Sequence, residues 1–228
     1  MSAIVPAGEA RAGDAGARIG AVLLAAGRST RMGGPDKLLA TIDGEPMVRR
    51  ALRTLQAVPL APIAVVLGAA PRAAEAVQAA LAGLPAYVAC TAPESADQQV
   101  SVDAGLRALP PDLDAIVVML SDQPLLDAAD LRWLIAQWRA LPRGCAAVPV
   151  FRGRRGNPVI LDGAMRAPIL AAGPSTGARG HLAGHPERVR RVEVPNDHYV
   201  VDVDTTDDLA RLAERGVRGA LGPSAPAA

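Results

Sequence analysis

IGAVLLA, residues 19–25, is followed without a break by AGRSTRMGGPDK, residues 26–37. The first run is apolar throughout, which is typical of a buried β-strand, and the second is rich in glycine, small polar and basic residues. Gly27 can take backbone angles that are closed to other residues, so that successive N–H groups can turn toward an anion. The stretch therefore predicts a buried strand that leads into a phosphate-binding loop.

Hydroxyl groups and cations accompany the glycines of this loop. Ser29 and Thr30 add hydroxyl donors, and Arg28, Arg31 and Lys37 supply the positive charge that three phosphates need. Lys37 is the only lysine among 24 basic residues, and a compact ammonium suits a crowded phosphate oxygen better than a planar guanidinium does. The alternative is that Lys37 has no role in phosphate binding and remains by chance in a composition biased toward arginine. The loop matches neither the P-loop nor the dinucleotide fingerprint, so a different nucleotide site is expected.

Strands and helices are predicted to alternate outward from this stretch. Short apolar runs rich in β-forming residues recur at 63–67, 86–89, 115–120, 146–150, 158–161 and 191–194. Helical spacing of apolar residues occurs at 47–55, 73–81, 102–109, 131–141 and 206–215. Alternation over the first two thirds predicts a three-layer α/β fold, with a mostly parallel sheet covered by helices on both faces. Ligands of such sheets bind beyond the carboxyl ends of the strands.

One domain is expected over residues 19–215, with a nucleotide half at 19–144 and an acceptor half at 145–215. The closely spaced strands of the second half predict an antiparallel extension of the sheet. Residues 1–18 and 216–228 have no periodicity and are predicted to be disordered tails. With two Trp, two Tyr and one Phe, the core must be built from Ala, Val, Leu and Ile.

Charge and composition exclude several classes of partner. A formal net charge of +1 gives no basic field for nucleic acid or an anionic membrane, so neither is expected as a partner. A signal peptide and a membrane-spanning apolar stretch are both missing, which predicts a cytoplasmic location. Cys90 and Cys145 are predicted to be ordinary buried thiols. His181, His185 and His198 are too dispersed to suggest a triad, and surface positions are expected for them.

A carboxylate follows the apolar run AIVVMLS, residues 115–121. Asp122 would project at the carboxyl edge of the sheet, with Pro124 enforcing a turn. One or two carboxylates can hold Mg²⁺ while phosphates and water fill its other positions. The alternative to metal binding is a structural role, because an isolated acid at a strand end is often a helix cap or a turn residue.

A second acidic cluster, VDVDTTDDL, lies at residues 201–209. Asp202 and Asp204 alternate in an extended segment, so they point the same way and can complete a metal shell. Asp207 and Asp208 are predicted to be acids in the first turn of a helix.

Two polar segments are candidates for recognition of the base and the acceptor. QQVSVDAGL, residues 98–106, runs into a helix with Ser101 as the expected N-cap, and capping alone is one interpretation of that serine. RGRRGNP, residues 152–158, is a basic turn that predicts either a charged hairpin tip or a clamp for an acceptor phosphate.

The run LAAGRSTRMGGPDKLL, residues 24–39, resembles the signature of the MobA-like nucleotidyltransferases, and within them the molybdenum cofactor cytidylyltransferases. The resemblance implies a Rossmann-like fold of the nucleotide-diphospho-sugar transferase type. It favours CTP over GTP, because Ala25-Ala26 stands where the guanylyltransferase branch has two glycines. The loop residues then expected to bind the nucleotide are Leu24, Ala25, Ala26, Gly27, Arg28, Ser29, Arg31 and Lys37.

Asp-Gln-Pro at 122–124 resembles the Gly-Asp-x-Pro metal motif of that family, with Ser121 in place of the glycine. The resemblance assigns metal contact to Asp122 and Asp204, and less firmly to Asp202. It places Ser101 near the base, although Gln98 and Gln99 depart from the usual pattern. Three further residues are carried over as acceptor contacts, from an Arg-Gly-Asn-Pro loop and a later Gly-Ala-Arg segment: Arg155, Asn157 and Arg179.

The reaction that the resemblance implies is Mg²⁺-dependent transfer of CMP from CTP to the terminal phosphate of molybdopterin, with release of pyrophosphate. Arg31, Lys37 and Asp122 would be catalytic, and a molybdoenzyme could receive the product. The first alternative is a nucleotidyl transfer with another nucleotide or another phosphorylated acceptor: guanylyl transfer from GTP to molybdopterin, or transfer to a sugar phosphate, methylerythritol phosphate or phospholactate. The second alternative is a non-catalytic protein that delivers the cofactor.

Overall fold

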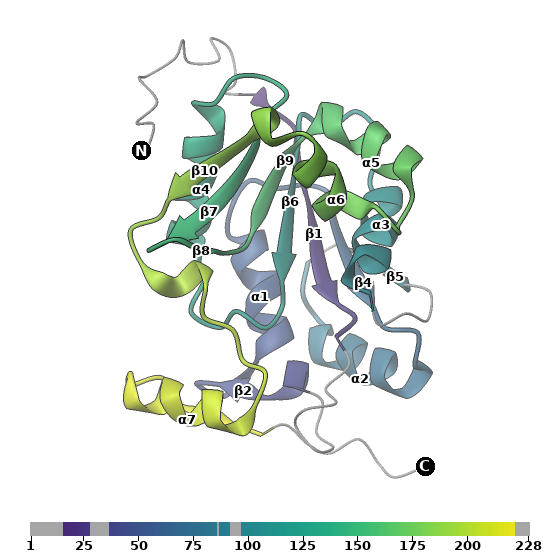
Figure 1. Cartoon of the computed structure of the whole chain (residues 1–228). Coiled ribbons are helices and arrows are strands. Elements are labelled where there is room, and N and C mark those ends of the chain that lie inside the picture. Colours follow the sequence, from purple (N-terminus) through teal and green to yellow (C-terminus); the bar gives the residue numbers. More distant parts are fainter. Residues whose placement is uncertain (1–15, 28–36, 86, 92–96, 222–228) are drawn as a thin grey trace.

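A computed structural model describes residues 16–27, 37–85, 87–91 and 97–221. Its main sheet has the strand order β10-β7-β9-β6-β1-β4-β5, with β8 paired to β7 (Figure 1). The pairs are parallel except that β9 runs antiparallel between β6 and β7, and β8 antiparallel to β7. The strands are β1 (Ile19–Ala25), β4 (Ile63–Leu67), β5 (Val88–Thr91), β6 (Ala115–Leu120), β7 (Ala146–Phe151), β8 (Arg154–Arg155), β9 (Val159–Asp162) and β10 (Val189–Glu193).

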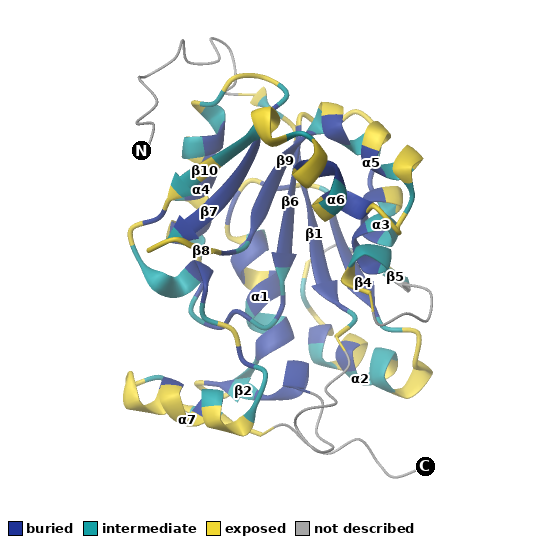
Figure 2. Ribbon diagram, viewed as in Figure 1, coloured by how far each residue is buried: buried dark blue, intermediate teal, exposed yellow. Residues whose placement is uncertain are grey.

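Helices cover both faces of this sheet, which confirms the predicted three-layer α/β fold. One face carries α1 (Met47–Gln56), α2 (Pro71–Leu81) and α4 (Ala128–Arg139), and the other carries α3 (Gln98–Ala108), α5 (Arg166–Ala172) and α6 (Gly177–Gly184). Side chains of β1 alternate between the two cores: Ala21 and Leu23 pack toward α1, whereas Val22 and Leu24 pack toward α3. Figure 2 shows the central strands β1, β4 and β6 buried along most of their length.

Helix α3 lies unusually close to the sheet. A Cβ at Gly105 would stand 2.4 Å from Val22 Cγ1, so only glycine allows this approach. The N-cap of α3 is Asp97, whose carboxylate accepts from the Gln99 N–H. Ser101, predicted to be the cap, lies inside the helix and is buried, so that prediction was wrong: an acid four residues earlier performs the capping.

A small second sheet lies beyond the carboxyl edge of the main one (Figure 1). It pairs β2 (Thr41–Ile42) with β3 (Glu45–Pro46) and β11 (Gly219–Ala220), and α7 (Thr206–Glu214) packs on it. Gly219 and Ala220 fall within the segment predicted to be a tail, yet they form β11. Four 3₁₀ helices complete the described elements: η3 (Lys37–Leu39), η4 (Gly163–Met165), η5 (Pro186–Arg188) and η6 (Asp197–Tyr199).

Two further expectations from the sequence need correction. His181 is 7% exposed rather than on the surface, and its ring lies 4.4 Å, centroid to centroid, from that of His185. Cys145 is buried as predicted, whereas Cys90 is only partly so. In the parts of the chain that the structure describes, no helix is long and apolar enough to cross a membrane.

Candidate active site

One ammonium group joins two carboxylates at the carboxyl edge of the sheet. Lys37 Nζ donates to Asp122 Oδ2 at 2.6 Å and to Asp204 Oδ1 at 2.7 Å. Lys37 opens η3, Asp122 follows β6, and Asp204 precedes α7, so three distant segments meet here. The structure thus brings together three residues that the sequence singled out independently.

The electrostatics of this cluster keep its lysine charged. The Lys37 side chain is nearly buried, and burial alone would lower its pKa, but the Asp122 and Asp204 carboxylates outweigh burial and raise it. Asp202 is more exposed, and its pKa is raised by partial desolvation and by the neighbouring Asp122 charge. The carboxyl edge of the sheet therefore carries three carboxylates and, among the described residues of this cluster, a single buried cation.

Two of these carboxylates fit the needs of a divalent metal bound to a nucleotide. Asp122 Oδ1 is buried and has no hydrogen-bond partner among the described residues, so this oxygen could bind a cation. The described residues contain no group of three or more His, Cys, Asp or Glu arranged to hold a metal by themselves. Mg²⁺ and Mn²⁺ sites built with phosphates need only one or two protein carboxylates, which Asp122 and Asp204 supply. Metal contact by Asp122, Asp204 and Asp202 stays a prediction.

Ser121 fixes the end of β6 to the end of β1. Its hydroxyl donates to the Leu24 carbonyl at 2.7 Å, and its N–H approaches the same oxygen at 3.3 Å. Ser121 is 3% exposed. Ser121 therefore holds the end of β1, which leads into the predicted phosphate-binding loop, beside the strand that precedes Asp122.

The Tyr199 carbonyl connects the loop after β6, which carries Asp122 and Gln123, with the Arg-Gly-Asn-Pro loop. It accepts from Gln123 Nε2 at 2.8 Å and from the Asn157 N–H at 2.9 Å. A Cβ on Gly156 would stand 2.3 Å from this oxygen, so glycine is required there. Gln123 is 4% exposed, and its Oε1 has no hydrogen-bond partner among the described residues. This junction fixes how far the two loops stand apart.

Asp130 of α4 in turn anchors Tyr199, whose side chain packs in the core on the same face of the sheet. The Tyr199 hydroxyl donates to the Asp130 carbonyl at 2.8 Å, while the Asp130 carboxylate accepts from Asn196 Nδ2 at 2.8 Å and from His198 Nδ1 at 2.7 Å. Sequence reasoning did not identify Gln123, Tyr199 or Asp130 as part of the site. Their link runs through main-chain carbonyls, for which the sequence carries no signal.

A pocket of about 250 Å³ lies between the sheet, α3 and α6. The predicted acceptor residues Arg155, Asn157 and Arg179 all line it, together with Gln98 and Gln99 at the start of α3. Its other lining residues are Leu24, Val102, Val118, Leu120, Gly156, Val159, Leu161, Ala178 and Leu182.

The first turns of α3 and α6 are locked together beside this pocket. Gln99 Oε1 accepts from the Arg179 N–H at 3.0 Å, and a Cβ at Gly177 would lie 2.5 Å from the same oxygen. Ser101 is 9% exposed and is not among the lining residues, so its contact with a base stays a prediction.

Part of the predicted nucleotide loop lies outside the described residues. Arg28, Ser29 and Arg31 belong to that part, so their roles stay predictions. Leu24 and Ala25 end β1, and Ala26 and Gly27 follow it, directly beside the cluster. A Cβ at Gly27 would lie 3.6 Å from Lys37 Cε, which places the loop entrance next to the lysine side chain.

The chain is similar to several known proteins. The sequence profile described as "MobA-like NTP transferase domain" matches residues 21–192. The 2-C-methyl-D-erythritol 4-phosphate cytidylyltransferase of Streptomyces avermitilis is 29% identical over 94% of this chain and 87% of its own. The nicotine blue oxidoreductase of Paenarthrobacter nicotinovorans is 30% identical over 84% of this chain and 94% of its own.

A solved structure with a bound metal is also similar. The complex of Rv0371C with manganese from Mycobacterium tuberculosis H37Rv is 29% identical, with a TM-score of 0.67 over 86% of this chain and 98% of that one. A protein of this fold therefore crystallises with a divalent cation.

Proposed function

Since the chain belongs to the MobA-like NTP transferase family and is a nucleotidyltransferase, we propose that it transfers CMP from CTP to the terminal phosphate of a molybdopterin-type acceptor. Pyrophosphate is the second product, and Mg²⁺ is the proposed metal. A molybdoenzyme that receives the product is the proposed protein partner.

The observation that carries this proposal is the contact of Lys37 with both Asp122 and Asp204. A charged lysine and two carboxylates at one sheet edge suit a metal–triphosphate complex better than they suit a purely structural ion pair, because Asp122 Oδ1 is left without a partner. The glycine-rich loop, which is expected to donate hydrogen bonds to phosphate, begins at Gly27 directly beside this cluster.

The acceptor phosphate brings its own nucleophile, an oxygen that attacks the α-phosphorus of CTP while the bond to pyrophosphate breaks. No catalytic Ser, His or Cys is needed, and catalysis comes from alignment and charge neutralisation. A divalent cation held by Asp122 and Asp204 would supply part of that neutralisation at the α-phosphate. Lys37, released from the carboxylates, would turn its ammonium to the departing pyrophosphate, with Arg31 as its predicted companion.

Separate features support each substrate. CTP is supported by Ala25-Ala26 and by the relative named as a cytidylyltransferase. A phosphorylated acceptor is supported by Arg155 and Arg179, which line the same pocket as Asn157. Molybdopterin is supported by the resemblance of residues 155–158 to the Arg-Gly-Asn-Pro loop of the cytidylyltransferases.

Other functions make different demands on the same site. Guanylyl transfer from GTP, or transfer to a sugar phosphate, methylerythritol phosphate or phospholactate, would use the same cluster with another base or acceptor. An oxidoreductase, as the name of one relative suggests, or a delivery protein would not need Lys37 between two carboxylates. The cluster therefore favours transfer over both.

The test is pyrophosphate release by the purified protein with Mg²⁺, Mo-molybdopterin and either CTP or GTP. Release that needs both acceptor and CTP is expected, and Asp122→Asn should lower it about 10²- to 10³-fold in a folded protein. Asp207→Asn is the matched control, because this carboxylate is exposed in the first turn of α7. Full activity of folded Asp122→Asn would contradict the role of this carboxylate, and preference for GTP would contradict the choice of nucleotide.

A further inference from the structure

Three arginines gather on one face of the sheet, next to the pocket. The register pairs Arg191 of β10 with Val148 of β7, and Arg155 of β8 with Val150 of β7. Paired residues on neighbouring strands share a face, and residues two apart on a strand share it as well. Val148 packs in the core beneath α6, so Arg155 and Arg191 lie on the α6 side, where Arg179 lines the pocket.

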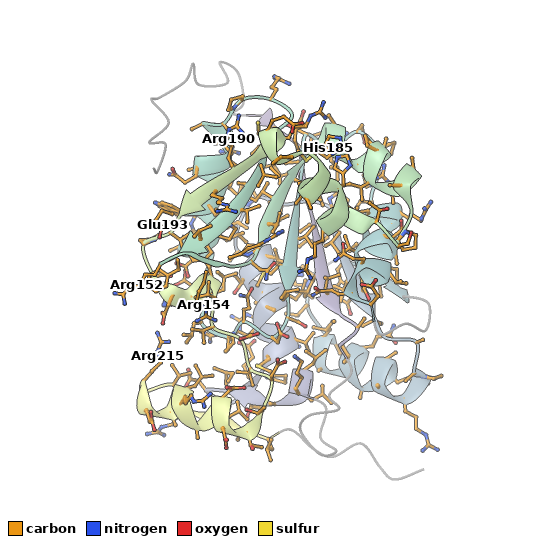
Figure 3. All side chains as sticks on the ribbon, viewed as in Figure 1. Arg152, Arg154, His185, Arg190, Glu193 and Arg215 are labelled. Atoms are coloured by element: carbon orange, nitrogen blue, oxygen red, sulfur yellow. The ribbon has the colours of Figure 1, made fainter. Side chains whose placement is uncertain are left out.

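None of these three guanidinium groups has an ion pair or a side-chain hydrogen bond among the described residues. Glu193 lies on the same face, but its carboxylate accepts from the Arg152 N–H at the β7–β8 turn, where Figure 3 shows the two side by side. Burial, Arg179 and Arg191 all lower the pKa of Arg155. All three residues are exposed to solvent, and three neighbouring cations without an ion-pair partner among the described residues create a positive potential that attracts anions.

The inner wall of the adjoining pocket is apolar. Leucine, valine and alanine side chains of β1, β6, β9, α3 and α6 form this wall, and the polar side chains of the pocket are two glutamines, one asparagine and two arginines. Carboxylates and hydroxyl groups are lacking among these described lining residues. A hydroxyl group of a sugar or polyol that faced the apolar wall would find no partner there, whereas the face of a flat ring can pack against it.

We propose that Arg191 completes, with Arg155 and Arg179, a site for a doubly charged phosphate monoester, and that the adjoining pocket selects acceptors whose phosphate is carried on a flat ring system. The role of this site as the acceptor site rests on the function proposed above. Arg191 would act as a specificity-determining residue, because a third cation favours a dianion over a monoanion of the same shape. The apolar wall would discriminate against sugar phosphates and methylerythritol phosphate.

Calorimetry with three probe anions tests this inference without any turnover. At pH 8, 2-naphthyl phosphate is a dianion on a flat ring, 2-naphthyl sulfate is a monoanion on the same ring, and glycerol 3-phosphate is a dianion on a polyol. The full chain should bind 2-naphthyl phosphate about tenfold more tightly than either of the others, the equivalent of one charge-assisted contact.

Arg191→Gln is the informative variant, and Arg190→Gln is its matched control. Arg190 is the preceding residue of β10, pairs with Ala147 on the opposite face, and donates to the Glu187 carbonyl. Arg191→Gln should weaken binding of 2-naphthyl phosphate about five- to tenfold and that of 2-naphthyl sulfate much less. Arg190→Gln should change neither, and CTP binding with Mg²⁺ should be the same in all three proteins.

The other outcomes overturn the proposal. Equal binding of phosphate and sulfate, equal effects of the two variants, or glycerol 3-phosphate binding as tightly as 2-naphthyl phosphate would each contradict it, as would no binding of 2-naphthyl phosphate. Pyrophosphate release reports separately on the proposed function. A protein that binds the probes as expected yet releases no pyrophosphate would contradict that function and leave the anion site standing.

Discussion

Replacing the lysine of the cluster should expose the repulsion between its carboxylates. In Lys37→Met the side chain keeps its length and apolar stem but loses the ammonium that donates to Asp122 and Asp204. Both carboxylates then lack this cation at the sheet edge. Without a metal we expect the variant to be less stable than the parent protein, and with a divalent cation we expect much of the difference to disappear.

The size of the effect follows from the exposure of the three side chains. Lys37 and Asp122 are 10% and 18% exposed, which makes this pair costly to break, whereas Asp204 is 36% exposed and water can solvate it in part. Removing one partner of a buried pair costs about 3–5 kcal/mol, and we take the lower end, about 3 kcal/mol, because of Asp204. For a chain of this length that corresponds to a fall in Tm of about 6–12 °C.

Thermal unfolding in EDTA and in Mn²⁺ measures both parts of this prediction. A cation present at about 100 times its Kd stabilises a protein by about 2.7 kcal/mol, so Mn²⁺ should recover most of the loss in Lys37→Met. The parent protein should gain less, because the ammonium must first leave the carboxylates. An unchanged Tm in EDTA, or an equal gain from Mn²⁺ in both proteins, would refute the reasoning. Turnover of the variant should remain about 10²- to 10³-fold lower even with metal.

Three further predictions concern the junction and the surface. Gln123→Met, which removes the donor to the Tyr199 carbonyl, should raise the KM for the acceptor several-fold without changing CTP binding; an equal loss for both substrates would point to general unfolding instead. Gly156→Ala should lower Tm by several degrees and impair acceptor use, because its Cβ would stand 2.3 Å from the same oxygen, and wild-type behaviour would contradict the close approach. Hydrogen bonds from Arg215 lower the pKa of Asp197, so this pair should contribute about 0.5 kcal/mol of stability near pH 7, and that contribution should be lost as the pH falls below about 4. Urea unfolding of Asp197→Asn at pH 7 and pH 3 checks it, and a difference from wild type that persists at pH 3 would contradict the assignment.

The central strands were predictable because their apolar runs are continuous. Strands β1, β4 and β6 have the bounds predicted from sequence, since a strand buried on both faces has no polar residue to interrupt it. Asp122 was predictable for the same reason, as the acid that ends such a run. Lys37 could be singled out because it is the only lysine of the chain and ends the glycine-rich run.

Helix α6 was not predicted, because its sequence GARGHLAG has three glycines and little periodicity. Ala178 and Leu182 pack in the core beneath it, so tertiary contact outweighs poor helix propensity. Arg179 could therefore be suggested only by resemblance, and Arg191 not at all: its proximity to Arg155 depends on the pairing of β10 with β7. Contacts through main-chain carbonyls, such as that of Tyr199, likewise become visible only when the chain is folded.

The most direct test of nucleotidyl transfer at this site follows two labels through the reaction. The protein is incubated with Mg²⁺, Mo-molybdopterin and CTP that carries ³²P at either the α- or the γ-phosphate, and the products are separated. The label at the α-phosphate should appear in the acceptor, and the label at the γ-phosphate only in pyrophosphate. Label from the α-phosphate that stays in CTP, or that appears only as CMP, would contradict the proposed transfer.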